Sequence, residues 1–397
     1  MTGTVIVDDN AVVDAVSRFL SDNDPTTMSD KEFLGRRFDA GLAWIDFPVG
    51  FGGLGGPRSL QRIIEQAMQR AGATPVDSMR NPVGLGMGAP TVVHHASEEL
   101  AHRVLRPLWT ADEIWCQLFS EPGAGSDLAN VATKAVRDGD EWIVDGQKVW
   151  TSLAHLSRWA MLLVRTDPTA PKHRGMTYFI LDMTTPGIDV RPLRQATGEA
   201  HFNEVFLNGV RIPDAMRISE PGDGWSVART TLTNERTAIG GKDAPREDGH
   251  IGRLAGLWRS RPDLRTTAAH ADLMRIWVEV EVARLTNERT RQIAATNATG
   301  LEGSGAKVTV ARNNQQVTRL AARLDPAQAL RYDEWSLENA PEQGSERPET
   351  YHYLRARPNS IEGGTTEILL GQIADRVLNL PREPKIDPTI PWQDIPR

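Results

Sequence analysis

Cysteine is almost absent from the 397-residue sequence, which contains only Cys116. A single cysteine excludes a disulfide within the chain and any metal cluster held by several cysteines. Two alternatives remain for Cys116: a nucleophile, or a small buried residue in a strand. We expect the second, because a free cysteine usually behaves as a small core hydrophobe.

Long apolar runs and basic clusters are missing as well. No stretch of 18 apolar residues occurs, so no segment is predicted to span a membrane. The net charge is −7, and no basic stretch indicates a nucleic-acid partner. The N-terminal stretch MTGTVIVDDNAVVDAVSRFL carries Asp where a secretory signal peptide has Lys or Arg. These features predict a cytoplasmic protein that binds neither nucleic acid nor a membrane.

Several familiar motifs are also lacking. The sequence has no Gly-x-Gly-x-x-Gly between a strand and a helix, no Gly-Lys-Ser/Thr phosphate loop and no Gly-x-Ser-x-Gly turn. His94 and His95 are adjacent, so on a helix they point about 100° apart and chelate one metal poorly. We predict no metal. The chemistry must come from a bound group or from isolated acids and bases.

Three regions with different sequence patterns follow one another along the chain. Residues 1–113 and 218–397 carry apolar residues at helical spacing, as in LQRIIEQAMQRAG and TTEILLGQIADRVLNL. Residues 114–217 contain short β-like runs separated by Asp-Gly and Asn-Gly hairpin signals. We therefore predict an α+β multi-domain fold: an N-terminal helical domain (1–113), a middle antiparallel β-barrel or sandwich (114–217) and a C-terminal helical bundle (218–397). A loop is predicted over 334–350, and an extended tail from Pro381.

Four motifs stand in a familiar order. CQLFSEPGAGSDLA begins the β region, DGQKVWTS follows it, GIDVRPLRQATGEAHFNEVFLNGVRIPDAMRI closes the region, and SIEGGTTEILLGQIADRVLNLPR lies near the C-terminus. With the helical–β–helical order, they make the chain resemble the acyl-CoA dehydrogenase family of flavoproteins over nearly its whole length. The resemblance implies that family's fold, FAD as cofactor and an acyl-CoA substrate. It also implies electron transfer to an electron-transfer flavoprotein, in the catabolism of fatty acids or steroids.

The resemblance further implies which residues meet the cofactor and the substrate. Taken alone, Pro122–Asp127 would be an ordinary turn and Trp150 a core residue of a strand. In the family, this turn and this strand border the flavin, whose ring needs directed hydrogen bonds, and glycines in the turn let the chain approach a bulky ligand. The residues assigned to the flavin are Gln117, Phe119, Ser120, Trp150, Thr151 and Ser152, and those assigned to the substrate are Gly125, Ser126 and Arg236.

The reaction also needs a base that takes a proton from the α-carbon of the thioester. A carboxylate in a closed apolar pocket suits this role, because desolvation raises its pKa. Much of the family carries this Glu just before Gly-Thr, where the present sequence has Gly363; another branch carries it before an Arg in the first helix of the C-terminal domain, where this sequence has Glu235-Arg236. We therefore expect Glu235 to be the catalytic base, with Glu362 as its competitor. The backbone N–H of Gly363 is expected to polarise the thioester carbonyl.

Two elements that hold the adenine end of FAD across a subunit interface in the family are missing. Arg-x-x-Phe-Gly should fall near Arg261 and Gln-x-x-Gly-Gly near 334–345, and neither is present. In this the chain resembles the base-carrying subunit of actinobacterial heteromeric acyl-CoA dehydrogenases that act on steroid side chains. We expect a homo-oligomer or a heterotetramer with a related chain. The Gly-rich segment NPVGLGMGAPT hints at room for a bulky acyl group.

Two other functions stay open at this point. The same scaffold is used by flavin oxidases and monooxygenases, which are distinguished by rapid reaction of the reduced flavin with O₂. The chain is alternatively a non-catalytic subunit that stabilises an assembly. The presence of Ser120, Trp150 and Ser152 together argues against this last alternative.

Overall fold

The computed structural model of the chain describes residues 7–76, 80–240, 246–247, 249–294, 302–331, 347–381 and 387–396. Helices make up the first part, and polar caps begin several of them. In α5 (Glu98–Trp109), the Ser97 hydroxyl accepts a hydrogen bond from the N–H of Leu100. The preceding helices are α1 (Asp9–Asp22), α2 (Asp30–Asp39), α3 (Gln61–Arg70) and α4 (Ala89–His95), and a π-helical turn, η2 (Gly84–Gly88), leads into α4.

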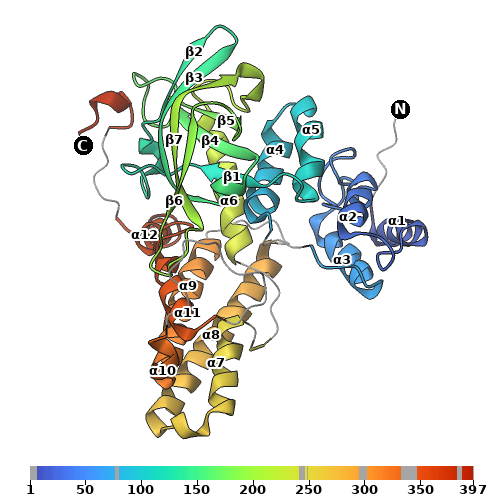
Figure 1. Cartoon of the computed structure of the whole chain (residues 1–397), viewed down its shortest axis with the longest axis vertical. Coiled ribbons are helices and arrows are strands. Elements are labelled where there is room, and N and C mark those ends of the chain that lie inside the picture. The colour runs from blue at the N-terminus through green and yellow to red at the C-terminus, as the bar shows by residue number, and fades with distance from the viewer. Residues whose placement is uncertain are drawn as a thin grey trace.

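A curled seven-stranded sheet forms the middle of the molecule (Figure 1). The strand order is β1-β4-β2-β3-β7-β6, with β5 beside β4. Most pairs are antiparallel, whereas β1 and β2 each pair with β4 in parallel. The strands are β1 (Trp115–Leu118), β2 (Lys134–Asp138), β3 (Glu141–Ser152), β4 (Trp159–Arg165), β5 (Met176–Asp182), β6 (Ile188–Leu193) and β7 (Phe202–Pro213). Strand β4 is buried along its whole length, as its continuous apolar run requires.

Helices return after the sheet. Figure 1 shows α6 against the sheet, with α7, α8 and α9 extending away from it. These helices are α6 (Gly224–Gly240), α7 (Gly249–Ser260), α8 (Thr267–Ala294), α9 (Glu302–Leu324), α10 (Pro326–Ala329), α11 (Glu349–Arg355) and α12 (Thr366–Arg376). Helix α11 begins inside the segment predicted to be a loop over 334–350, of which residues 334–346 lie outside the described part of the chain.

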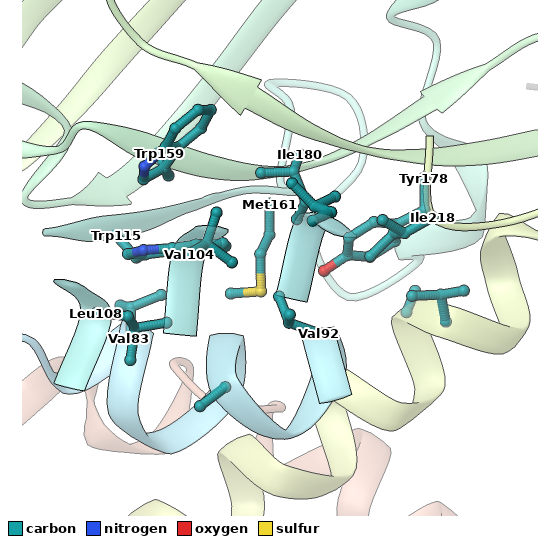
Figure 2. Packing of buried hydrophobic residues seen from close by; sticks show 14 of the residues in the cluster. Val83, Val92, Val104, Leu108, Trp115, Trp159, Met161, Tyr178, Ile180 and Ile218 are labelled. Carbon is teal, nitrogen blue, oxygen red and sulfur yellow. The ribbon is translucent and has the colours of Figure 1, made fainter. Parts of the chain in front are cut away.

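The largest core cluster joins the sheet to the helices. In Figure 2, Trp115, Met161 and Tyr178 of the strands and Val92 and Val104 of the helices point toward one another. This shared core fixes β1 relative to α4 and α5, and it includes two residues of α6, Val227 and Ala228. The edge of β1 and the start of α6 are therefore held by the same packed interior.

The predicted order of helices, sheet and helices is confirmed, whereas the boundaries at 113 and 217 stay predictions. Across the described ranges, the structure has no helix of the length and apolar character that crossing a bilayer requires. The Pro-rich tail leaves α12 and returns to the sheet. The N–H of Trp392 donates to the carbonyl of Ala170 at 2.9 Å, and the Trp392 indole donates to Asn130 Oδ1 at 2.8 Å.

Candidate active site

The side chain of Glu235, on α6, meets that of Gln117, on β1. Gln117 Nε2 lies 3.5 Å from Glu235 Oε2, a long hydrogen-bond contact between residues 118 positions apart. Both side chains are partly buried. The amide oxygen of Gln117, Oε1, is buried and has no hydrogen-bond partner among the described residues. A buried acceptor without a partner is costly, so this oxygen is available for a donor on a bound molecule.

One turn before Glu235, Thr231 anchors α6 to its surroundings. Its hydroxyl lies 3.0 Å from Thr91 Oγ1 on α4 and 3.0 Å from the Tyr178 hydroxyl on β5. Burial raises the pKa of the Tyr178 hydroxyl, so Tyr178 stays protonated in this network. Residues four apart on a helix share a face. The contacts of Thr231 therefore set where the carboxylate of Glu235 lies.

The two motifs at either side of the predicted flavin are joined by a buried ion pair. Lys148 Nζ lies 2.8 Å from Glu121 Oε1 and also donates to the carbonyls of Phe119 and Leu163 at 3.0 and 2.7 Å. The Glu121 carboxylate in turn accepts the N–H groups of Ala132 and Thr133. This network holds the Pro122–Asp127 turn against β3.

Burial and charge act in opposite directions on this pair. Burial by itself raises the pKa of Glu121, but the Lys148 ammonium and the donated hydrogen bonds bring it below its ordinary value. Burial lowers the pKa of Lys148, and the charge of Glu121 opposes this effect. Neither Glu121 nor Lys148 was predicted from the sequence as a functional residue. Opposite charges in two otherwise apolar strand motifs were the available signal.

Beyond Lys148, strand β3 departs from regular pairing. The register with β7 shifts between Lys148 and Thr151, and Trp150 has a φ of 62° in the left-handed region. This conformation turns the indole outward, leaving Trp150 60% exposed, with its ring edge-on to Phe202. The hydroxyl of Thr151 is buried and has no partner within the described part of the chain.

The other residues assigned to the flavin lie around this bulge. The carbonyl of Ser120 accepts the N–H of Val149 at 2.9 Å, which brings the end of β1 beside β3. Phe119 is 3% exposed, its ring packs edge-on against Tyr178, and its carbonyl accepts from Lys148, so the structure presents Phe119 as a packing residue beneath the site. Ser152 is partly buried at the end of β3.

These residues fit a planar, polar ring system. An exposed aromatic face at Trp150 and unpaired buried acceptors or donors at Gln117 and Thr151 are what a flavin would pair and cover.

The residues assigned to the substrate lie on the solvent side. Gly125 and Ser126 are exposed at the tip of the turn. Arg236 follows Glu235 in α6, but its side chain lies outside the described part of the structure. A cavity of about 580 Å³ lies beside this turn and brings Pro122, Gly123 and Asp127 together with Ile395 and Pro396 of the returning tail.

Glu362, the competing base, is fully engaged. Its carboxylate accepts Arg355 Nη1 and Nη2 at 3.0 and 3.2 Å, and Asn359 Nδ2 at 2.6 Å. The next two residues, Gly363 and Gly364, both have left-handed φ values of 64° and 95°. These contacts bind Glu362 to Arg355 of α11, whereas the carboxylate that meets Gln117 is that of Glu235.

Two further predictions concern burial and packing. Cys116 is buried in β1, as expected, and burial raises the pKa of its thiol to about 12. The segment NPVGLGMGAPT was expected to leave room for a bulky acyl group, and at two of its glycines this expectation is wrong. A Cβ on Gly84 would lie 2.5 Å from Asn81, and one on Gly88 would lie 3.2 Å from Trp115, so these glycines permit close packing.

Arg261 lies where the family's adenine-binding arginine is expected, and its guanidinium forms hydrogen bonds to carboxylates of its own chain. Its guanidinium donates to Asp263 at 3.0 and 2.8 Å and to Asp325 at 2.8 Å. The second expected element, at 334–345, lies outside the described residues. Among the described residues, no group of three or more His, Cys, Asp or Glu could hold a metal.

Comparison with known proteins places these features in a wider context. Residues 116–210 match the middle domain of acyl-CoA dehydrogenases, and residues 222–378 match their C-terminal domain. The chain is 35% identical to acyl-CoA dehydrogenase IpdE1 of Mycobacterium tuberculosis over 360 residues, covering 87% of this chain and 86% of that protein. It is 39% identical to acyl-CoA dehydrogenase FadE34 of the same organism over 349 residues, but spans only 45% of that relative's length.

Solved structures with the same fold include two complexes. The Tcur3481–Tcur3483 steroid ACAD superposes with a TM-score of 0.71 at 25% identity, covering 94% of this chain and 97% of the other. The ChsE4–ChsE5 complex from Mycobacterium tuberculosis superposes with a TM-score of 0.68 at 24% identity, covering 96% of this chain and 100% of the other.

Proposed function

The chain belongs to the acyl-CoA dehydrogenase family, a family of flavin-dependent oxidoreductases, and we propose that it catalyses the FAD-dependent α,β-dehydrogenation of an acyl-CoA thioester. The observation that carries this proposal is the contact of Glu235 with Gln117, where α6 meets β1. It joins the proposed base to the strand on which the family carries its flavin. The chemistry that bound FAD supplies is acceptance of the hydride from the β-carbon.

Glu235 is the base in this proposal. It receives the proton from the α-carbon, and its partly buried position and its anchoring through Thr231 support the role. Glu362 is a poorer candidate, because three donated hydrogen bonds from Arg355 and Asn359 occupy its oxygens and tie it to the segment around α11.

The remaining groups bind and orient the reactants. Trp150, Thr151 and Ser152 would cover one side of the flavin, and Gln117 and Ser120 would meet its pyrimidine edge. The N–H of Gly363 would donate to the thioester oxygen, where negative charge develops as the proton leaves. The exposed turn at Gly125 and Ser126 and the side chain of Arg236 are assigned to the CoA part of the substrate.

The proposal includes a second chain. Arg261 is bound by Asp263 and Asp325 within its own subunit, and the Phe-Gly that would complete an adenine-binding element does not follow it. We therefore assign to this chain the base-carrying role in a heterotetramer, with a steroid-type acyl group as substrate. The resolved Tcur3481–Tcur3483 steroid ACAD and the ChsE4–ChsE5 complex support this assignment by similarity. We assign an electron-transfer flavoprotein as the electron acceptor of this chain.

An absorbance spectrum followed by anaerobic titration tests the proposal. The chain is purified alone and after co-expression with a related acyl-CoA dehydrogenase chain, and is then mixed with straight-chain, branched and steroid-side-chain acyl-CoAs. We expect a flavin spectrum that is bleached by at least one acyl-CoA. Rapid reoxidation of the reduced flavin by O₂ would indicate an oxidase or monooxygenase instead. Absence of flavin with and without partners would indicate a non-catalytic subunit.

A further inference from the structure

The C-terminal tail of the chain packs against the segment that follows the Pro122–Asp127 turn. The match to the family's C-terminal domain ends at residue 378, so the tail lies outside both matched domains. Most residues of the tail over 387–396 are exposed, but Trp392 is only 8% exposed. A buried tryptophan provides both apolar contact area and a hydrogen-bond donor. The surroundings of Trp392 therefore show what the tail contacts.

Backbone hydrogen bonds hold the tail to the loop between β4 and β5. The N–H of Trp392 donates to the carbonyl of Ala170 at 2.9 Å, and the N–H of Gln393 donates to the carbonyl of Pro168 at 3.1 Å. These two bonds set the register of the tail against the loop. They bring the indole of Trp392 beside residues 129–131, to which it is also bound through its side chain.

Trp392 and Arg165 together bind three consecutive residues. The Trp392 indole donates to Asn130 Oδ1 at 2.8 Å, and the centroid of its ring lies 4.6 Å from Arg165 Cζ. Arg165 is 2% exposed, and it donates to the carbonyls of Ala129 and Val131 at 2.6 and 3.3 Å. An aromatic ring over a buried guanidinium adds attraction to these hydrogen bonds, because little water competes for the cation. These contacts clamp the segment to the tail.

The same arginine supports the end of the Pro122–Asp127 turn by a second route. Arg165 Nη1 donates to the carbonyl of Lys172 at 2.7 Å, and the Lys172 ammonium pairs with the Asp127 carboxylate. This ion pair is weak by itself, because the side chain of Asp127 is 61% exposed. Residues 129–131 begin two positions after Asp127. The clamp on these residues is therefore the firmer of the two supports of the turn.

The turn and the tail also face a common cavity. Its volume is about 580 Å³, and Gly123 and Asp127 of the turn and Ile395 and Pro396 of the tail are among the residues that line it. The turn has few restraints of its own, because a Cβ on Gly123 or Gly125 would have nothing within 4 Å and glycine has wide backbone freedom. Ordering a binding segment when the ligand arrives lowers affinity. Contacts that fix the turn in advance therefore favour ligand binding.

We propose that Trp392 is a positioning residue for acyl-CoA binding, which clamps residues 129–131 to the tail and thereby holds the Pro122–Asp127 turn in the conformation that meets the substrate. The inference rests on the proposed function, in which Gly125 and Ser126 of this turn contact the CoA part. Trp392 takes no part in the transfer of the proton or the hydride. Its substitution should therefore change the affinity for acyl-CoA and leave the chemical step as it is.

Two substitutions and a control within the same tail test the clamp. Trp392→Ala removes both the ring over Arg165 and the donor to Asn130, whereas Trp392→Phe retains a ring and loses the donor. The control is Asp387→Ala, which removes an exposed carboxylate that accepts hydrogen bonds from Thr389 of the tail. All variants are prepared as the complex that carries FAD, and folding is checked by circular dichroism and urea unfolding.

The first measurement separates KM from kcat with the acyl-CoA that bleaches the wild type. In Trp392→Ala we expect KM to rise about tenfold at nearly unchanged kcat, which is of the order expected for the loss of one hydrogen bond and one cation–π contact. Trp392→Phe should show a smaller rise, and Asp387→Ala none. A wild-type KM in a less stable Trp392→Ala protein would overturn the positioning role. If that variant does not fold, a wild-type KM in Trp392→Phe would do so.

The second measurement needs no substrate. Hydrogen exchange of the amides in 123–133 should be fastest in Trp392→Ala, intermediate in Trp392→Phe, and equal in Asp387→Ala and the wild type. Equal exchange in all four proteins would show that the tail does not hold this segment, and would overturn the inference. A wild type that no acyl-CoA bleaches would instead count against the proposed function, which is a distinct result because the exchange rates do not depend on it.

Discussion

Gln117 Nε2 on β1 and Glu235 Oε2 on α6 lie 3.5 Å apart, although 118 positions separate the two residues in the sequence. This contact links the motif at the start of the sheet to the first helix after it. An amide beside a carboxylate orients the carboxylate without neutralising it, because the amide carries no charge.

The assignment of the base predicts opposite results at two glutamates. Glu235→Gln should lose about 10²–10⁴ in turnover while FAD stays bound, because the loss of a general base costs this much. Glu362→Gln should retain turnover, since Glu362 is occupied by Arg355 and Asn359. Steady-state kinetics and flavin absorbance are measured on the same preparations. An active Glu235→Gln protein with an inactive Glu362→Gln protein would transfer the role to Glu362.

The bulge in β3 predicts the position of the flavin. Trp150→Ala combined with Ser152→Ala should lower FAD occupancy or shift the flavin spectrum, because both residues are assigned to the ring. Val136→Ala, which removes another exposed apolar side chain of the same sheet, should change neither. An unchanged spectrum at full occupancy in the double variant would show that this strand does not meet the flavin.

The engagement of Arg261 predicts dependence on a partner for tight FAD binding. Purified alone, the chain should hold FAD weakly or incompletely, because a ligand gripped at one end gains less interaction energy against the same association entropy. Co-expression with a related chain that carries Arg-x-x-Phe-Gly should raise the flavin content per chain. Flavin content and mass in solution are measured together. Stoichiometric FAD in the chain alone, unchanged by any partner, would contradict this prediction.

The buried ion pair predicts a large stability effect. Lys148→Met should lower the free energy of unfolding by about 3–5 kcal/mol, because it leaves the Glu121 carboxylate buried without its cation. Lys134→Met should change it by no more than about 0.5 kcal/mol, since Lys134 and its partner Asp145 are both exposed and 3.8 Å apart. Urea unfolding followed by circular dichroism measures both. Equal effects for the two variants would show that the buried Lys148–Glu121 pair contributes no more to the free energy of unfolding than an exposed pair does.

The same pair predicts how stability depends on pH. The folded-state pKa of Glu121 lies below its ordinary value of 4.5, so Glu121 contributes stability above about pH 4.5 that is lost as the pH falls through the lowered pKa. The difference in urea midpoint between the wild type and Glu121→Gln should therefore be largest near neutral pH and narrow below pH 4.5. A difference that stays constant from pH 7 to pH 3.5 would be inconsistent with an ionised Glu121.

Features that depend on local sequence patterns could be predicted from the sequence. Helical spacing, hairpin dipeptides and ordered motifs predicted the arrangement of helices around a sheet, whereas the assignment of the base to Glu235, made from Gly363 and Glu235 together, stays a prediction. The contacts of Glu362 were not predictable in this way. Whether a carboxylate is free or bound by Arg355 depends on how α11 meets the following turn, and that is decided by tertiary packing.

The same limit applies to charges inside the protein. Lys148 and Glu121 are 27 positions apart, and neither motif indicates that the two side chains form a buried ion pair. Gly84 and Gly88 show the converse difficulty. A glycine in the sequence is compatible with open space or with close approach, and only the positions of Asn81 and Trp115 decide between them.

The backbone at Gly363 also limits which side chains this turn can carry. A φ of 64° is unfavourable by roughly 1–2 kcal/mol for a residue with a Cβ. A glutamate introduced at 363 by a single substitution would strain the turn and would add a carboxylate next to Glu362. This conformation is therefore suited to glycine and not to a carboxylate base, and a variant Gly363→Glu would be expected to lose stability whether or not Glu235 is the base.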